Sequence, residues 1–350
     1  MSPRRPTIAD VAREAGVSPS TASVVFSGKA PVSEATRERV TRAAEQLGYT
    51  GPDPRAASLR TGRSGIVGVL LAGRLGAAFL DPATRIMMDG LSEAIAPLGA
   101  GLLLLRDEAP DDAAPTLTTA PIDAAVLVGC SPHARASLDP VRARGIPTVV
   151  IEGDAGPGVP RVTLDNRAAQ RALAEHVQGL GHRRVAAVTL PHDARRRRRG
   201  VLPTDAEITV EVTRDRLDGV RDVFPDAVVV TTLGSSVDEG LEAGRLLLRD
   251  ADARPTAVLA QSDMLAAGII RAAEEAGLRV PGDLSVTGFD GVHVDGLGPY
   301  VLTTQVQDAA AKGRAAGEAV AAMLRDGTAS SAHLTCTFRA GNTTGPPSAD

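Results

Sequence analysis

Apolar residues recur at helical spacing in three short stretches of the first fifty residues. In the first stretch, positions 8, 11, 12 and 15 are apolar and follow Thr7, whose hydroxyl can cap a helix. Gly16 can end that helix because glycine tolerates a positive φ, and Ser18 followed by proline begins a second helix near residues 20–26. A third helix is predicted from the cap Ser33 to the stop at Gly48. The first two helices and their short turn form a helix-turn-helix motif.

From residue 66 onward, short apolar runs alternate with helical patterns. Strands are predicted at 66–71, 102–105, 125–128 and 148–151, with helices near 83–98 and 135–144. The rhythm repeats after residue 165, with a helix over 166–180 and strands at 185–189, 227–231, 257–260 and 285–288. Strands that alternate with helices predict parallel sheets with helices on both faces, here in two similar halves.

The composition suits this architecture and argues against several classes of protein. Of the 350 residues, 43% are hydrophobic and nearly all of these are aliphatic, with no Trp, two Tyr and five Phe. Cys130 and Cys336 stand alone and the six histidines show no ligand spacing, so neither a disulfide framework nor a metal site is expected. The sequence offers no leader-like start and no long uncharged apolar stretch, so we expect a cytoplasmic protein that is neither exported nor membrane-spanning.

The charge is distributed unevenly. The whole chain has a net charge of −4, whereas residues 1–63 carry ten basic and six acidic side chains, a local charge of +4. A basic head confines the attraction for phosphate to one end of the chain. Arg195–Arg199 is a run of five arginines, for which a solvated loop is preferred over a second nucleic-acid patch.

Several motifs together resemble one family. The stretches TIADVAREAGVSPSTAS, VSEATRERVTRAAEQLGY and RAASLRTGRSGIVGVLL resemble, in order and spacing, the head, third helix and hinge of the LacI/GalR (lactose-repressor) family. PTAVLAQSDMLAAGIIRAAEEAGLRVPGDLSVTGFD and LTTQVQD resemble its two-lobed, periplasmic-binding-protein-like sensor. Departures occur at residues 107–120, where Pro and Thr weaken the expected helix, and in the longer segment around 73–82.

The resemblance implies a division of the chain. A helix-turn-helix head would occupy residues 1–50, and a linker with a hinge helix would occupy 51–64. An α/β effector-binding body would span 65–342, with lobe 1 at about 65–163 and 295–325 and lobe 2 at about 164–293 and 327–342, before a tail at 343–350.

The second helix of the head is the predicted reader of DNA, because its N-terminal side chains can reach base edges in the major groove. Pro19, Ser20 and Val24 would face the bases. Val24 stands where many relatives carry Arg or another polar reader, so we expect an apolar contact with a thymine methyl or no direct readout there.

Two further kinds of DNA contact are predicted. Short hydroxyls near helix N-termini can hold phosphates, and each could equally be only a helix cap; these residues are Thr7, Ser18, Thr21 and Ser23. Residues 55–60 form about one helical turn, too short to be stable alone. By resemblance this hinge helix orders on DNA and Leu59 wedges into the minor groove, whereas the alternative is that Leu59 packs against the sensor. One additional residue before Leu59 relative to some relatives leaves the register of the hinge open.

The candidate effector site lies where parallel strands end, because open sheets bind ligands at the carboxyl ends of their strands. The family resemblance, which includes the stretch RDRLDGV, implies the candidate residues. Arg216 and Asp290 are the leading ones, since a guanidinium and a carboxylate can grip hydroxyls, amides or anions. The same match implies these further residues: Phe79 as a stacking surface, Asp165, Asn166, Ser262 and Asp263. The alternative is an interlobe ion pair or helix caps without a ligand, and Asp263 in particular is expected to cap the helix that follows it.

The sequence therefore predicts a regulator of transcription and not an enzyme. We expect a dimer, with a tetramer as the alternative, that binds a pseudo-palindromic operator at the nucleoid, represses, and responds to a sugar or sugar-like effector. No cofactor, metal or catalytic residue is expected. The competing classes are a transporter's solute-binding protein, which the head and the missing export signal disfavour, and an α/β enzyme, for which neither P-loop, G-x-G-x-x-G nor nucleophile elbow occurs.

Overall fold

The computed structural model describes residues 6–28, 30–51, 62–71, 75–106, 116–129, 138–193 and 198–348. The chain divides into two compact units, Met1–Ser64 and Gly65–Asp350. The first unit is the head and the second is the body. No described helix is both long enough and apolar enough to traverse a bilayer.

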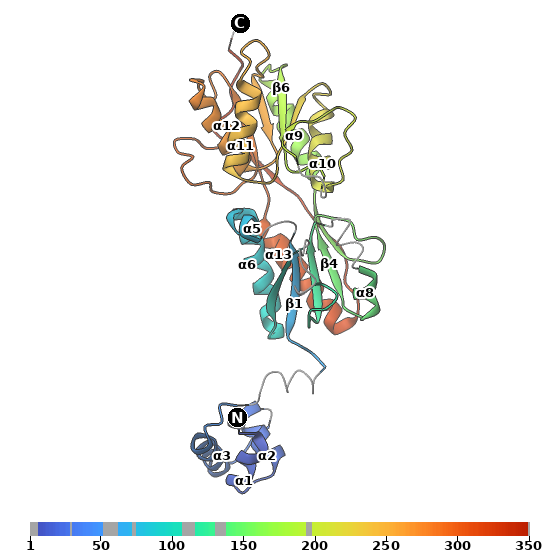
Figure 1. Cartoon of the computed structure of the whole chain (residues 1–350), viewed down its shortest axis with the longest axis vertical. Coiled ribbons are helices and arrows are strands. Elements are labelled where there is room, and N and C mark those ends of the chain that lie inside the picture. Colours follow the sequence, from blue (N-terminus) through green and yellow to red (C-terminus); the bar gives the residue numbers. More distant parts are fainter. Residues whose placement is uncertain are drawn as a thin grey trace. The chain divides into compact units, whose positions relative to one another are not determined.

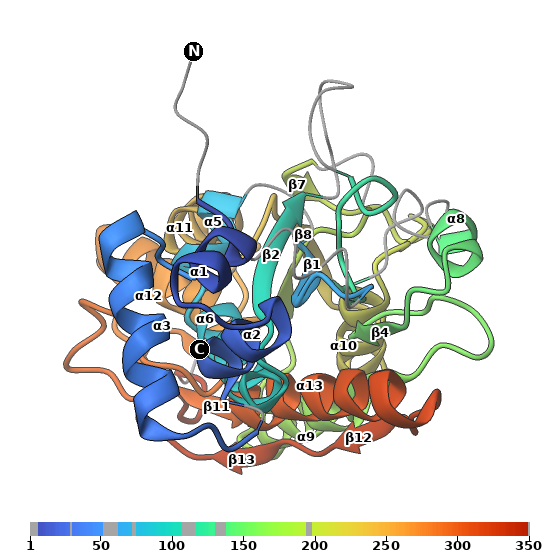
Figure 2. The same ribbon diagram turned by 90° about the horizontal axis from the view of Figure 1, so that it is seen from below.

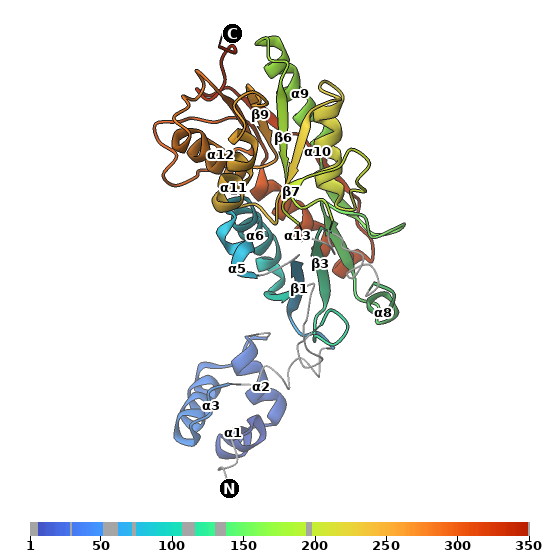
Figure 3. The ribbon, with the colours of Figure 1, turned by 45° about the horizontal axis from the view of Figure 1, so that its top comes forward.

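The head is a bundle of three short helices (Figure 3): α1 (Ile8–Glu14), α2 (Pro19–Ser27) and α3 (Glu34–Leu47). Ser18 and Ser33 cap α2 and α3 by accepting bonds from backbone amides, and Gly28 and Gly48 end these two helices with φ of +63° and +65°. Small aliphatic side chains meet in the centre of the bundle. They are Val11, Ala12, Ala15, Ala22, Val40, Ala43 and Ala44. The predicted helix-turn-helix unit is therefore present.

Lobe 1 of the body is built on a parallel sheet of six strands in the order β12-β5-β4-β3-β1-β2. The strands are β1 (Ile66–Leu71), β2 (Gly101–Arg106), β3 (Ala124–Val128), β4 (Thr148–Ile151), β5 (Arg161–Leu164) and β12 (Ala332–Leu334). Its helices are α5 (Leu75–Leu80), α6 (Pro82–Ile95), the 3-10 turn η1 (Ala96–Leu98), α8 (Leu138–Ala143) and α13 (Ala309–Asp326). Alternate strand residues face two cores, one under α6 and α13 and the other under α8. Figure 2 shows α8 apart from α6 and α13.

Lobe 2 has seven strands in the order β13-β11-β10-β9-β6-β8-β7. They are β6 (Val185–Thr189), β7 (Gly200–Val201), β8 (Val228–Thr231), β9 (Ala257–Ala260), β10 (Ser285–Asp290), β11 (Thr303–Val306) and β13 (Thr337–Arg339). The edge strands β7 and β13 run antiparallel to their neighbours, and the other pairs are parallel. One face is covered by α11 (Val237–Leu248) and α12 (Asp263–Glu275), the other by α9 (Asn166–Gly179) and α10 (Glu211–Arg221) (Figure 1).

The chain passes between the two sheets three times, between β5 and α9, between β11 and α13, and between β12 and β13. The expected limits of the lobes are wrong at the C-terminal end. β11 belongs to the second sheet although residues 295–325 were expected in lobe 1, and β12 belongs to the first sheet although residues 327–342 were expected in lobe 2. The reason is that each sheet takes one short edge strand from the last segment of the chain.

Candidate DNA-binding and effector sites

The N-terminal end of α2 carries a cluster of hydroxyls. Ser18 Oγ accepts a bond from the Thr21 amide at 3.1 Å and lies 2.8 Å from both Ser20 Oγ and Thr21 Oγ1. Ser18, Pro19 and Ser20 are exposed, whereas Thr21 is half-buried. The cluster therefore presents polar groups to solvent at the positive end of a helix dipole, where an anion is favoured.

The remaining candidate residues of the head fall into three groups. Thr7 is engaged in a capping box, since its hydroxyl accepts from the Asp10 amide while the Asp10 carboxylate accepts from the Thr7 amide at 2.9 Å. Ser23 and Val24 are half-buried on α2. Leu59 and the predicted hinge helix lie outside the described residues.

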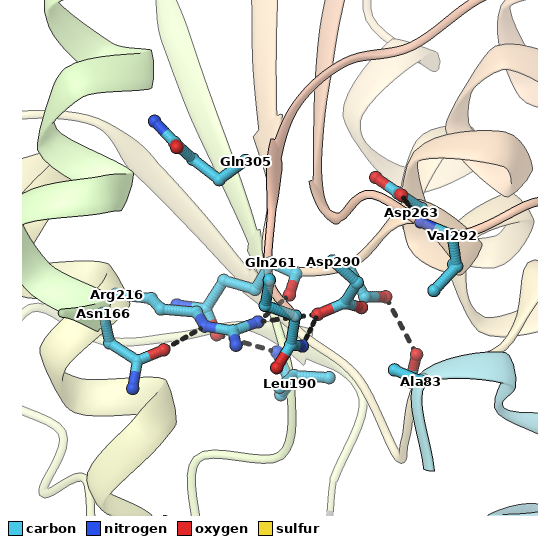
Figure 4. Close-up of polar contacts among 12 residues, drawn as sticks. Ala83, Asn166, Leu190, Arg216, Gln261, Asp263, Asp290, Val292 and Gln305 are labelled. Atoms are coloured by element: carbon cyan, nitrogen blue, oxygen red, sulfur yellow. Dashed lines mark hydrogen bonds and ion pairs between the residues drawn. The ribbon is translucent and has the colours of Figure 1, made fainter. Parts of the chain in front are cut away.

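In the body, Arg216 of α10 lies at the centre of a polar cluster (Figure 4). Its side chain is 3% exposed. Its Nε donates to Asn166 Oδ1 at 2.8 Å, and its Nη1 donates to the backbone oxygen of Gln261 at 2.6 Å and lies 3.6 Å from Asp290 Oδ1. The guanidinium carbon also lies 3.5 Å from the centroid of the Phe289 ring, a cation-π geometry.

Asp290 is the last residue of β10 and has a φ of +113°, outside the range that side chains usually adopt. Its Oδ1 accepts a bond from Gln307 Nε2 at 2.6 Å. Burial raises the pKa of Asp290 to about 8, and the positive charge of Arg216 opposes this rise. The ionisation of this carboxyl therefore depends on the cations around it. The structure thus brings together the two residues that the sequence singled out most strongly.

Ser262 and Asp263 lie at the start of α12. Ser262 is the N-cap of α12 and accepts from the Leu265 amide, so the expectation that Asp263 caps this helix is wrong. Asp263, the first residue of the helix, accepts instead from the Val292 amide at 2.8 Å and from the Thr304 hydroxyl at 2.7 Å. Burial raises the pKa of Asp263 to about 7. The carboxyl thus ties α12 to β11 and to the segment that follows β10.

Two other candidates are placed differently from Arg216 and Asp290. Asp165 Oδ1 accepts from the Cys336 amide at 2.8 Å and so joins two of the chain's passages between the lobes. Burial, followed by the charge of Asp165, raises the pKa of the Cys336 thiol to about 12, so this thiol stays neutral. Phe79 lies on α5 with half of its surface exposed, and no described contact connects it with Arg216.

Sequence reasoning missed several partners of the cluster, namely Glu152, Gln261, Gln307 and Lys312. Lys312 did carry a signal, because it is one of two lysines in a chain with 38 basic residues. Of the arginine run, residues 195–197 lie outside the described part of the chain, and Arg199 forms an ion pair with Glu239. Among the described residues, no group of His, Cys, Asp and Glu is arranged to hold a metal.

Comparisons with known proteins decide the family. The model for bacterial regulatory proteins of the lacI family matches residues 7–51, and the model for a periplasmic binding protein-like domain matches residues 174–344. The HTH-type transcriptional regulator Rv3575c of Mycobacterium tuberculosis is 36% identical over 99% of this chain and 100% of its own length. The chain belongs to the lacI family. It is a DNA-binding transcriptional regulator and not an enzyme.

Two more comparisons extend this result. The ribose operon repressor of Escherichia coli is 29% identical to this regulator over 85% of the chain and 87% of its own length. A crystal structure of the lac repressor dimer bound to operator and an anti-inducer superposes with a TM-score of 0.75 and 22% identity, over 98% of this chain and 100% of that one. The predicted fold class, a helical head on a two-lobed α/β body, is confirmed.

Proposed function

We propose that this regulator is a repressor that binds a pseudo-palindromic operator as a homodimer and is controlled by a sugar or sugar-like effector held between the two lobes of its body. The observation that carries the proposal is the buried pair of Arg216 and Asp290 at the carboxyl edge of the lobe 2 sheet. A parallel α/β sheet binds its ligands at this edge. The name of the ribose operon repressor, and the operator-bound dimer of lac repressor, support repression and the dimer by similarity.

At the DNA end, the first turns of α2 enter the major groove. Pro19, Ser20 and Val24 contact base edges, and the phosphate contacts come from short hydroxyls: Thr7, Ser18, Thr21 and Ser23. The exposed hydroxyl cluster at the start of α2 supports this assignment. Leu59 is the proposed minor-groove wedge.

At the effector end, Arg216 and Asp290 form the floor of the site and can exchange bonds with ligand hydroxyls. Ser262, Asp165 and Phe79 are the proposed additional contacts. A ligand that prefers one degree of lobe closure shifts DNA affinity only by its differential affinity for the two states, typically about 1–3 kcal/mol. This is the thermodynamic route by which a small ligand controls repression.

The dimer follows from the operator, because one head covers one half-site. Two large apolar side chains of lobe 1 support a contact with a second copy: Leu80 is 71% exposed and Ile86 37%. We place the protein in the cytoplasm, at the nucleoid.

The test is selection of DNA bound by the purified protein from a random pool, repeated with a panel of sugars and polyols. We expect enrichment of one twofold-symmetric sequence and a change in its retention with at least one compound. Asp290→Asn should keep the enriched sequence but lose the response to the compound, because the head is a separate unit. Enrichment of no symmetric sequence at physiological salt refutes the operator, and a response that persists in Asp290→Asn refutes the effector site.

The absence of tryptophan supplies a second readout. Phe79→Trp introduces a single tryptophan, and the proposal expects its fluorescence to change with the compound that alters DNA retention. Unchanged emission with an intact DNA response removes Phe79 from the effector site.

A further inference from the structure

Two amide side chains in the body occupy equivalent positions, each between a cation and a carboxylate. Asn166 accepts from Arg216 Nε at 2.8 Å and donates to Glu152 Oε2 at 2.9 Å. Gln307 accepts from Lys312 Nζ at 2.5 Å and donates to Asp290 Oδ1 at 2.6 Å. An amide has one acceptor and one donor end, so each orients its dipole from its cation toward its carboxylate.

The two units join into one chain of contacts because Arg216 lies 3.6 Å from Asp290. The order is Glu152, Asn166, Arg216, Asp290, Gln307, Lys312, and we call this set the relay. The charged side chains of the relay alternate in sign. Asn166 lies between Glu152 and Arg216, and Gln307 lies between Asp290 and Lys312, whereas Arg216 and Asp290 are direct neighbours. Hydrogen bonds in such series strengthen one another in a low-dielectric interior.

The relay begins and ends in lobe 1 and passes through lobe 2. Glu152 directly follows β4 of the first sheet, and Lys312 lies in α13, which packs against that sheet. Arg216 and Asp290 belong to α10 and β10 of the second lobe. Asn166 and Gln307 lie at or beside two of the passages between the lobes. The pair at the centre is thus held by lobe 1 from both ends.

Backbone strain marks the two carboxylates of the relay independently. Among the described residues, Glu152 and Asp290 are the two non-glycine residues with a positive φ, at 55° and 113°. Such conformations persist where the surrounding structure imposes them, and they cluster at functional positions.

Burial of the Lys312 ammonium is unfavourable, and its hydrogen-bond partners must offset that free energy. Its side chain is 7% exposed, and it lies near the N-terminus of α13, where the helix dipole disfavours a cation. All but two of the 38 basic residues are arginines. A lysine here therefore indicates that the site takes a compact ammonium in place of a planar guanidinium.

We propose that Glu152 and Lys312 are positioning residues that clamp the Arg216–Asp290 pair to lobe 1 through Asn166 and Gln307. The proposed function enters only because it gives the clamped pair an effector to bind. Through the clamp, residues of lobe 1 directly influence the ionisation of Asp290. The charged groups around that carboxyl come from four places: Arg216 on α10, Lys312 on α13, Asp263 on α12 and Asp81 before α6.

The test follows the Asp290 carboxyl in the full chain by NMR, with aspartate 13C-labelled at the carboxyl and the signal assigned from Asp290→Asn. Lys312→Met should raise the titration midpoint of Asp290 by about one pH unit because a nearby cation is lost. Glu152→Gln should lower the titration midpoint of Asp290. Without the negative charge of Glu152, the positive charge of Arg216 acts more fully on the Asp290 carboxylate. Arg314→Met, an exposed cation two residues further along α13, is the matched control and should leave the midpoint in place.

An unchanged midpoint in Lys312→Met, or a shift of the same sign in both relay variants, overturns the clamp. If Lys312→Met does not fold, Lys312→Gln removes the charge while keeping a polar side chain. A urea-unfolding cycle gives the second readout: Asp290→Asn should have a different effect in the Lys312→Met background than in the parent, and strict additivity contradicts the inference. Neither measurement needs an operator or an effector, so failure of the proposed function and failure of the clamp are seen separately.

Discussion

Arg216→Met removes the only cation in direct contact with Asp290 among the described residues while keeping an unbranched apolar stem. The substitution deletes two charge-assisted hydrogen bonds, to Asn166 and to the backbone of Gln261, and leaves a carboxyl in a buried site. A hydrogen bond to a charged group contributes about 1.5–3 kcal/mol, so the two bonds together contribute about 3–6 kcal/mol. We expect a loss of unfolding free energy of about that size, measured by urea denaturation followed by far-UV circular dichroism.

The pH dependence distinguishes this cost from a simple packing defect. The folded pKa of Asp290, about 8, lies above its unfolded value, so its contribution to stability is present below the unfolded pKa and is lost as the pH rises through 8. Without Arg216 the folded pKa rises further. The deficit of Arg216→Met should therefore be constant between about pH 5 and 7 and grow above about pH 8, by up to about 1.4 kcal/mol per pH unit.

Arg245→Met is the comparison, because it removes an arginine whose partners Glu242 and Glu275 are solvent-exposed. Its loss should be much smaller and should not grow above pH 8. Equal losses in the two variants, or a deficit for Arg216→Met that is flat up to pH 9, refute the electrostatic reasoning.

Three further expectations follow from single residues. Thr7→Ala removes one half of the α1 capping box and should cost the head about 1 kcal/mol, measured by the thermal unfolding of its helices; no loss contradicts the capping role. Gly313→Val should lower the Tm of the body strongly, because a Cβ there would lie 1.9 Å from the Met87 carbonyl oxygen, while Gly101→Ala, where a Cβ meets nothing within 4 Å, should have a small effect; similar shifts count against close helix packing. Val24→Arg should move the selected operator toward guanine, and an unchanged preference removes Val24 from the base contacts.

The sequence was sufficient wherever structure is decided by neighbouring residues. The helix boundaries of the head follow from Thr7, Ser18, Ser33 and Gly48, whose capping roles depend only on the backbone beside them. Strands buried on both faces were also predicted to the residue, at 66–71, 148–151, 185–189 and 257–260, because they are continuous apolar runs.

Elements decided by distant partners were not predictable. The strands β5, β11, β12 and β13 are three or four residues long, and several of their positions are polar. Their strand character comes from pairing with segments far away in the chain, as when Ala332 pairs with Val162. A short, mixed pattern contains no information about that partner.

The candidate site shows the same division. Arg216 and Asp290 were found because each stands in a stretch that resembles a motif of the family. Gln307 and Lys312 were missed because their importance comes from the passage between β11 and α13, which brings them to Asp290. The rarity of lysine was visible in the sequence, but its partner was not.

The threefold passage of the chain between the sheets has a consequence for synthesis on the ribosome. The head comprises residues 1–64 and has its own core, so it can fold as soon as it emerges. Lobe 1 must wait for α13 and β12, and lobe 2 must wait for β13, all of which lie beyond residue 308. A nascent chain halted near residue 300 would therefore carry a finished DNA reader on an unfinished body with open sheet edges, so release of an intact regulator depends on its last forty or so residues.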